Sequence, residues 1–252
     1  MKQFKVTKYM DQFFNTNEEL TFFDIGSCDG IDSIEYSKHF PNASIFSFEP
    51  VKNNFIKIIQ NIKENKTAKI FPFNIALGNK KGRVKFHLSS VDEKKIPGSI
   101  GDSVNPEELG NKSGSLLQPE LHEKFYPWIS FTEAEDVDVE TISEFCSEHS
   151  IRNIDFIHMD VQGAELIVLE GAKDFIDKIN LVWMEVSKVS YYKNQPLQKD
   201  VESFMRAHGF LLLKDNIDYP HGDRLYIRKN FFILKKGKLN YFLKKLMTFG
   251  SV

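Results

Sequence analysis

The chain has 252 residues, of which 41% are hydrophobic, and a formal net charge of -2. This length is enough for one large α/β domain or two small ones, and the small net charge disfavours a general nucleic-acid-binding surface. The two cysteines, Cys28 and Cys146, lie far apart in the sequence and match neither a zinc motif nor a disulfide framework.

Short apolar runs alternate with segments of helical periodicity along most of the chain. The pattern predicts strands at residues 20–26, 43–50, 69–77, 154–163 and 179–187, and helices at residues 31–40, 51–65, 164–176 and 197–210. Residues 82–90 read as a further extended piece, and residues 137–149 as a short strand followed by a helix. Two closing strands, residues 210–215 and 224–229, have no helical pattern between them.

This alternation predicts a mostly parallel sheet with helices on both faces. The closing pair of strands predicts an antiparallel hairpin at one edge. We expect a single domain over residues 1–252, with its core at about residues 20–230. In such sheets ligands bind beyond the carboxyl ends of the strands.

Two regions fall outside the pattern. Residues 89–136 are rich in Gly, Pro, Ser and Glu, and a connection of this length is typical of a lid or binding loop, so we expect it to contact the acceptor. Residues 231–252 are basic and apolar, and a helix there would align Leu239, Phe242, Leu243, Leu246 and Met247. Such a segment is a candidate for homodimer contact, for peripheral membrane contact or for a frayed tail.

The start of the chain lacks the apolar core of a signal peptide. No stretch approaches the roughly 20 apolar residues of a membrane span. We therefore expect a cytoplasmic protein.

The turn after the first predicted strand is rich in glycine and acids. Gly26 and Gly30 stand at a spacing that differs from the dinucleotide fingerprint, because Cys28 fills the place of its second glycine. Asp24, Asp29 and Asp32 would repel a pyrophosphate and suit a cationic ligand. Turn chemistry and helix capping alone are the alternative explanation.

Glu49 ends the second predicted strand, about 20 residues beyond the turn, where dinucleotide-binding folds place the acid that holds ribose hydroxyls. A ribose without a pyrophosphate, together with a positive charge near carboxylates, fits S-adenosylmethionine. The sequence therefore predicts this cofactor at the first turn.

Several blocks together resemble the FkbM family of S-adenosylmethionine-dependent methyltransferases, from about Phe22 to Glu185. They are Asp24-Ile25-Gly26-Ser27-Cys28-Asp29-Gly30-Ile31-Asp32, Phe48-Glu49-Pro50, Asn74-Ile75-Ala76-Leu77-Gly78, Ser113-Gly114-Ser115, His158-Met159-Asp160-Val161-Gln162-Gly163-Ala164-Glu165, Gly171-Ala172 and Glu185. His158 stands where the family usually has Lys, and Gln162 where it usually has Glu.

The resemblance implies a Rossmann-like class I methyltransferase fold, with a mostly parallel seven-stranded sheet and an antiparallel edge hairpin. It implies that the cofactor binds at Asp24, Gly26, Ser27, Gly30, Asp32, Glu49, Pro50, Asn74 and Ala76, and the acceptor at Ser113 and Ser115. It also implies O-methyl transfer to a hydroxyl, usually of a sugar.

An alcohol needs a base or a metal to become a good nucleophile. Asp160 and Glu185 each end a predicted strand, and His158 lies two residues before Asp160 on the same strand face. His158 or Asp160 is one candidate base, and Asp160 with Glu185 holding Mg²⁺ or a similar cation is the other route. A packed strand histidine is the alternative reading of His158, and we expect His221 to be a surface turn residue.

We expect Phe125, Tyr126 and Trp128 either to stack on the acceptor or to anchor the insertion on the core. The predicted function is O-methylation of a sugar hydroxyl, on a nucleotide-activated sugar or on a glycan intermediate of bacterial surface polysaccharide. A nicotinamide-dependent oxidoreductase and a non-catalytic S-adenosylmethionine-binding partner protein are the alternatives.

Overall fold

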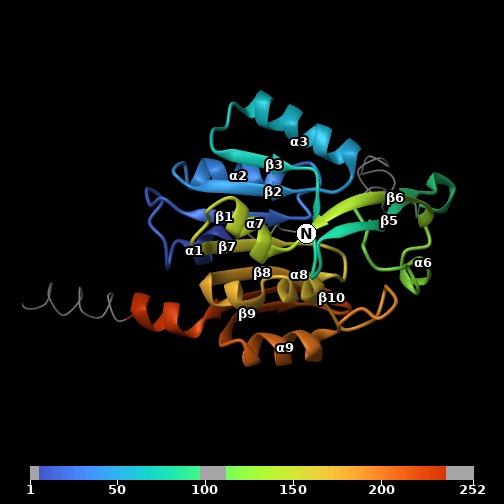
Figure 1. Cartoon of the computed structure of the whole chain (residues 1–252). Helices are drawn as coiled ribbons and strands as arrows, with labels where there is room; N and C mark the ends of the chain where they lie inside the picture. Colours follow the sequence, from blue (N-terminus) through green and yellow to red (C-terminus); the bar gives the residue numbers. More distant parts are fainter. Residues whose placement is uncertain (1–5, 97–111, 237–252) are drawn as a thin grey trace, which may run out of the picture.

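The computed structural model describes residues 6–96 and 112–236. Seven strands form its central sheet, in the order β3-β2-β1-β7-β8-β10-β9 (Figure 1). Their bounds are β1 Thr21–Ile25, β2 Ser44–Phe48, β3 Ile70–Phe73, β7 Ile154–Met159, β8 Ile179–Ser187, β9 Phe210–Ile217 and β10 His221–Arg228. The helices are α1 Thr7–Met10, α2 Ile31–His39, α3 Lys52–Asn65, α6 His122–Phe125, α7 Ile142–Glu148, α8 Glu165–Glu170 and α9 Gln198–Ala207, with 3₁₀ helices η1 Glu93–Lys95 and η2 Lys173–Lys178.

The central sheet confirms the predicted fold class. Strands β3, β2, β1, β7 and β8 pair in parallel, while β10 is antiparallel to both β8 and β9. The closing hairpin therefore occupies one edge of the sheet. Pro72 lies in β3 at the other edge, where the missing N–H interrupts no ladder between two strands.

Alternating side chains of the central strands build a separate core on each face. Phe22 packs with α1 and α2, next to Phe40 and Tyr36, while Phe23 packs on the opposite face beside Phe145 of α7. Helices α8 and α9 cover the same face as α7, and Ile62 places α3 on the face of α2. Both faces of the sheet are thus covered, as the continuous apolar runs of β1 and β7 require.

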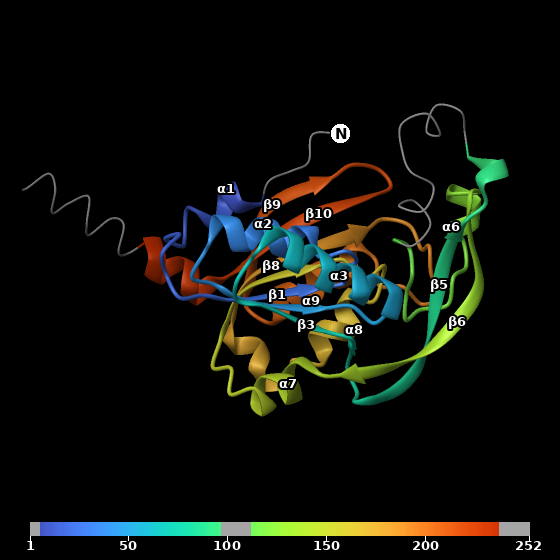
Figure 2. The same cartoon turned by 90° about the horizontal axis from the view of Figure 1, so that it is seen from above.

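A second, three-stranded sheet stands across the carboxyl end of the central one, as Figure 2 shows. Its strands are β4 Ala76–Leu77, β5 Gly82–Val91 and β6 Ile129–Glu140, with β6 in the middle. Residues 69–77 were expected to form one strand, but the chain leaves the central sheet at Asn74 and enters the second one at Ala76. The region 89–136 likewise begins and ends in strand rather than in loop.

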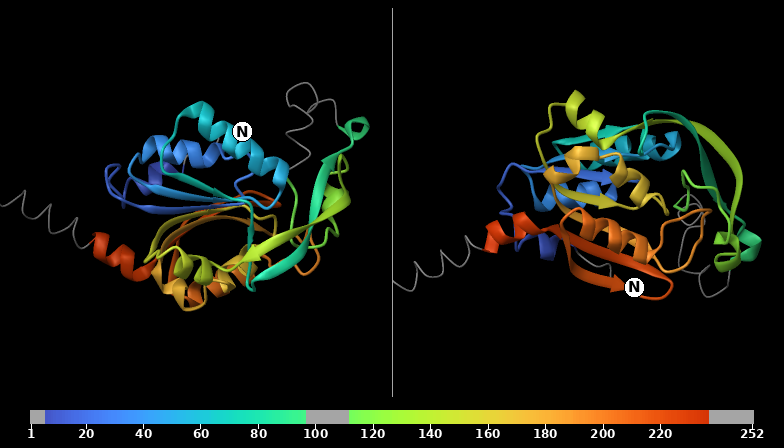
Figure 3. Two further views of the ribbon diagram at one scale, coloured as in Figure 1. Left: turned by 45° about the horizontal axis from the view of Figure 1, so that its top comes forward. Right: turned by 60° about the horizontal axis from the view of Figure 1, so that its bottom comes forward.

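The chain after β10 forms a helix over residues 229–236, at the end of the sheet opposite to β5 and β6 (Figure 3). Phe231 and Phe232 pack against Phe13, with ring centroids 6.4 and 6.2 Å away. Ile233 and Leu234 are exposed. The apolar face expected from Leu239 to Met247 lies outside the described residues. Within the described ranges, no helix is both long and apolar enough to cross a bilayer.

Candidate active site

The turn between β1 and α2 is held against the end of β2. The backbone amides of Gly26 and Ser27 both donate to the carbonyl oxygen of Phe48, at 3.0 and 3.1 Å. Gly26 and Gly30 have φ angles of 83° and 77°, and Cys28 between them has a φ of 51°. Glycine adopts this left-handed region without steric penalty. The two glycines therefore allow the chain to turn sharply between β1 and α2.

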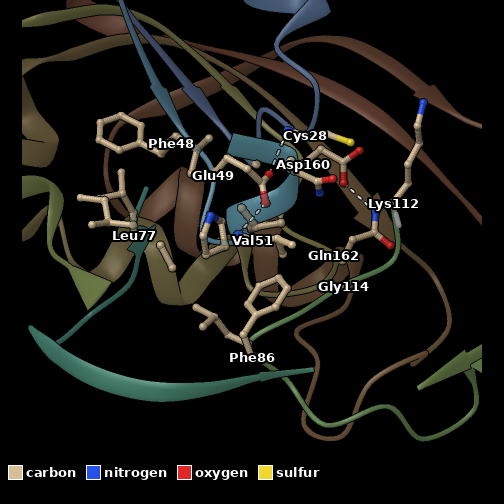
Figure 4. A pocket seen from close by; sticks show the side chains of 18 residues that line it. Cys28, Phe48, Glu49, Val51, Leu77, Phe86, Lys112, Gly114, Asp160 and Gln162 are labelled. Atoms are coloured by element: carbon tan, nitrogen blue, oxygen red, sulfur yellow. Dashed lines mark hydrogen bonds between the residues drawn. The ribbon is translucent and has the colours of Figure 1, made fainter. Parts of the chain in front are cut away.

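A cavity opens beside this turn, between the carboxyl ends of β1, β2 and β7 (Figure 4). Val51, Leu77 and Phe86 give it apolar walls, and Glu49 adds a carboxylate. The two oxygens of Glu49 accept hydrogen bonds from the backbone amides of Cys28 and Val51, each at 2.9 Å. Burial raises the pKa of Glu49 to about 7. Asn54 adds a side-chain hydrogen bond, which leaves one of the four lone pairs of the carboxylate to accept a ligand hydroxyl.

Six of the nine residues predicted to contact the cofactor line the cavities at this edge. They are Gly26, Ser27, Asp32, Glu49, Pro50 and Ala76. Asn74 lies behind the wall, where its side-chain nitrogen donates to the carbonyl oxygens of Glu49 and Pro50 at 2.9 and 2.8 Å. A Cβ on Gly30 would lie 3.0 Å from the Ile58 side chain, so this glycine provides space for packing. Asn74 and Gly30 support the cavity and do not line it.

Asp24 is the third predicted cofactor residue that does not line one of these cavities. It forms a buried polar group with His158. Its carboxylate accepts from the Ser33 hydroxyl at 2.5 Å and lies 3.5 Å from His158 Nδ1. The Tyr36 hydroxyl lies 3.2 Å from the same nitrogen. Burial raises the pKa of Asp24 to about 6. His158 and Asp160 both line a second cavity of about 620 Å³, the largest of the three at this edge of the sheet, as their shared strand face predicts. His158 Nδ1, however, is held within this polar group.

Asp160 and Glu185 face one another across the ends of neighbouring strands, as expected. The side-chain nitrogen of Gln162 donates to Asp160 Oδ1 at 2.6 Å and to Glu185 Oε2 at 3.3 Å. Burial and the adjacent Asp160 raise the pKa of Glu185 well above its usual range. Gln162 thus supplies the donor that two neighbouring carboxylates need.

The side chains around Asp160 and Glu185 do not fit the metal site that the sequence analysis gave as one possibility. No group of three or more His, Cys, Asp and Glu side chains within residues 6–96 and 112–236 is arranged to hold a metal ion. The Gln162 amide nitrogen, which is a hydrogen-bond donor and not a ligand, is the group that these two carboxylates share.

A further cavity with aromatic walls adjoins Asp160 and Glu185. Its aromatic lining consists of His122, Tyr126, Trp128, Tyr191, Tyr192 and His221. Phe125 points elsewhere: it is 40% exposed and meets Tyr191 edge to face at 5.2 Å. Of the three aromatics predicted to stack or to anchor, Tyr126 and Trp128 reach the cavity.

The two serines predicted to contact the acceptor have different surroundings. Ser113 lines the aromatic cavity, and its carbonyl oxygen accepts from the Tyr192 hydroxyl at 2.7 Å. Ser115 is fully buried, and its hydroxyl donates to the Gln162 carbonyl oxygen at 2.8 Å. Ser115 therefore fixes the Gln162 backbone, and only Ser113 is placed to touch an acceptor.

Comparison with known families decides the identity of this arrangement. The model of the methyltransferase FkbM domain matches residues 24–212, which include the carboxyl ends of β1, β2, β7 and β8. The chain belongs to the FkbM methyltransferase domain family.

Characterised proteins similar to this FkbM domain include 2-O-methyltransferase NoeI of Sinorhizobium fredii, which is 31% identical over 172 residues, 68% of this chain and 65% of that protein. Methyltransferase 1 of Beauveria bassiana is 24% identical over 152 residues, 60% of this chain and 57% of that protein. The matches thus span less than two thirds of either relative. A solved structure of M. capricolum TrmK in complex with S-adenosyl-homocysteine has 13% identity and a TM-score of 0.48, covering 91% of this chain and 70% of that one.

This FkbM domain contains site residues that the sequence did not single out. Lys112 lines all three cavities, and Cys28 lines two of them. The expectation that His221 is a surface turn residue is wrong, because it lines two cavities and its Nε2 lies 3.7 Å from Glu185. His221 begins β10, which pairs with β8, the strand that carries Glu185. The sequence pattern predicted that the closing strand begins only at residue 224, so it left His221 in the loop.

Proposed function

We propose that the protein is an S-adenosylmethionine-dependent O-methyltransferase that acts on a sugar hydroxyl. One observation carries the proposal: the cavity beside the glycine turn and the aromatic cavity meet at Asp160 and Gln162. A donor in the first cavity and an acceptor in the second would therefore react at the ends of β7 and β8. Membership of a methyltransferase family supports this reading over a nicotinamide-dependent oxidoreductase.

The chemistry of the first cavity fits the cofactor. Glu49 would accept a hydrogen bond from a ribose hydroxyl, and Val51, Leu77 and Phe86 would enclose the adenine. Asp32, in the adjoining cavity, would pair with the ammonium group. When bound, the cofactor supplies an electrophilic methyl group on a sulfonium. The residues of the chain hold it, exclude water and set the direction of attack.

The aromatic cavity supports a sugar acceptor. Tyr126, Trp128 and Tyr191 offer ring faces for the C–H surface of a sugar, while Glu185 and Asp160 offer acceptors for its hydroxyls. The name of a relative, 2-O-methyltransferase, supports transfer to oxygen. We propose as acceptor a nucleotide-activated sugar or a glycan intermediate of bacterial surface polysaccharide. We also propose a cytoplasmic location, in keeping with the free thiols of Cys28 and Cys146.

Calorimetric titration with S-adenosylhomocysteine tests the cofactor first. We expect micromolar binding by the wild type, loss of at least about tenfold in affinity for Glu49→Ala, and no change for Glu64→Ala on the exposed side of α3. Preferential binding of a nicotinamide dinucleotide would favour the oxidoreductase instead. No binding by the folded wild type would overturn the assignment.

Transfer of a labelled methyl group tests the reaction itself. The purified protein is incubated with labelled S-adenosylmethionine and a panel of glycans and nucleotide sugars. Product formation by the wild type supports the proposal. Cofactor binding without transfer to any member of the panel would favour a non-catalytic partner protein.

A further inference from the structure

His221 lies where the aromatic cavity meets the largest cavity. It is the first residue of β10 and pairs in register with Ser187 of β8, next to the strand position of Glu185. Its side chain is 33% exposed and lines both the aromatic cavity and the largest cavity. Since Asp160 and Glu185 line the same two cavities, His221 faces the region in which transfer is proposed.

Tyr191 forms a hydrogen bond with one of the two ring nitrogens of His221. The Tyr191 hydroxyl lies 3.1 Å from His221 Nδ1. Tyr191 is 5% exposed, is fixed by Phe125 at a ring distance of 5.2 Å, and forms a side-chain hydrogen bond with Tyr126. Its own hydroxyl proton can go to Tyr126, so its oxygen can accept from Nδ1–H. That tautomer leaves a lone pair on Nε2.

The other nitrogen of His221 lies beside Glu185 at the aromatic cavity. Nε2 lies 3.7 Å from Glu185 Oε1, which is too far for a hydrogen bond and close enough for strong attraction between charges. Burial lowers the pKa of His221, and Asp160 opposes that effect. The ring is therefore neutral at pH 7, and an imidazolium formed during turnover would be stabilised by the charge of Asp160.

We infer that His221 is the general base of the methyl transfer, with Tyr191 and Glu185 as its positioning residues. The inference rests on the proposed function. His221 Nε2 takes the proton of the acceptor hydroxyl while the hydroxyl oxygen forms its bond to the methyl carbon. The electron pair of the broken carbon–sulfur bond stays on sulfur, and the proton on Nε2 leaves to solvent.

The other candidate bases are less free to accept a proton. Nδ1 of His158 is engaged by Tyr36 and lies beside Asp24. Asp160 and Glu185 already share the Gln162 amide. A carboxylate that accepts a hydrogen bond is a weaker base than one that does not. His158 lines the largest cavity, whereas His221 also lines the aromatic cavity in which the acceptor is proposed to bind.

Kinetics of His221→Gln test the inference. We expect kcat/KM to fall at least about a hundredfold, while affinity for S-adenosylhomocysteine changes less than about threefold and circular dichroism stays unchanged. His39→Gln, at an exposed histidine paired with Asp11, is the matched control and should keep full activity. Activity of His221→Gln above about a third of the wild-type level, in a wild type that transfers methyl, would refute the inference and leave the proposed function intact.

An NMR titration provides a readout that needs neither cofactor nor activity. The C2 proton of His221 should report a neutral ring at pH 7. Asp160→Asn should lower the pKa of His221 further, because the charge of Asp160 is the one that raises it, and Tyr191→Phe should change the tautomer. The other titratable groups around the ring are Glu185, His122 and Tyr126. A ring that is protonated at pH 7, or one insensitive to both variants, would overturn the inference even if no acceptor had been found.

Discussion

A Cβ atom on Gly26 would lie 1.9 Å from the carbonyl oxygen of Asp160. The carboxyl ends of β1 and β7 are this close because the Asp160 amide donates to the Ile25 carbonyl oxygen at 3.0 Å. Gly26 belongs to the cavity of the glycine turn and Asp160 to all three cavities. The contact therefore sets the distance between the proposed donor and acceptor.

Gly26→Ala should damage the site through this contact. The added methyl group meets backbone, which cannot rotate away, and the φ of 83° is strained for alanine. We expect a loss of unfolding free energy of about 2 kcal/mol or more and weaker S-adenosylhomocysteine binding, measured by urea denaturation and calorimetry. Gly82→Ala is the control, because its φ of 159° is also unusual but its Cβ would meet nothing within 4 Å. Equal effects of both variants would contradict the role of the contact.

Glu49 should make stability depend on pH. Its pKa is about 4.5 unfolded and about 7 folded, so the folded state holds the proton more tightly. This contribution is fully present below pH 4.5 and is lost as pH rises through 7. The unfolding free energy of wild type minus that of Glu49→Gln should therefore fall by roughly 3 kcal/mol between pH 4.5 and 7.5. Urea denaturation of both proteins at several pH values measures it, and a difference that grows with pH would contradict the assignment.

Gln162→Glu should weaken catalysis although it restores the residue usual in the family. The new carboxylate replaces the donor shared by Asp160 and Glu185 with a third negative charge. We expect kcat/KM to fall at least about tenfold at pH 7.5 and to recover partly at lower pH. The pH profile of methyl transfer measures this, with Gln60→Glu on the exposed side of α3 as control. An unchanged profile would show that the shared amide is dispensable.

The charge of the site predicts which acceptors are preferred. Seven acids line the largest cavity, namely Asp29, Asp32, Glu35, Asp160, Glu185, Asp218 and Asp223, against Lys112 as the single Lys or Arg that the structure places there. A diphosphate would be repelled by this field. We expect kcat/KM at least about tenfold higher for neutral glycans than for nucleotide sugars, with the gap narrowing as salt is added. Faster turnover of nucleotide sugars at low salt would reverse this preference.

Much of the fold could be predicted from the sequence, because local patterns carry it. The adjacent Phe22 and Phe23 indicated a strand buried on both faces, and they do pack into opposite cores. The pattern failed at residues 69–77, where one apolar run serves two sheets. Nothing local marks that change, because the Asn74 side chain that fixes it binds to Glu49 and Pro50, far away in the sequence.

The sequence by itself determined the family, the strand-to-helix turn at Gly26 and the acids at the strand ends, because motif spacing and side-chain periodicity are local properties of the chain. Only the tertiary structure decided what each group faces. It set Asp24 behind the cavity wall beside His158, gave Gln162 two carboxylates to bridge, and brought His221 to Glu185. Those relations depend on strand order and register, which join residues far apart in sequence and leave no local signal.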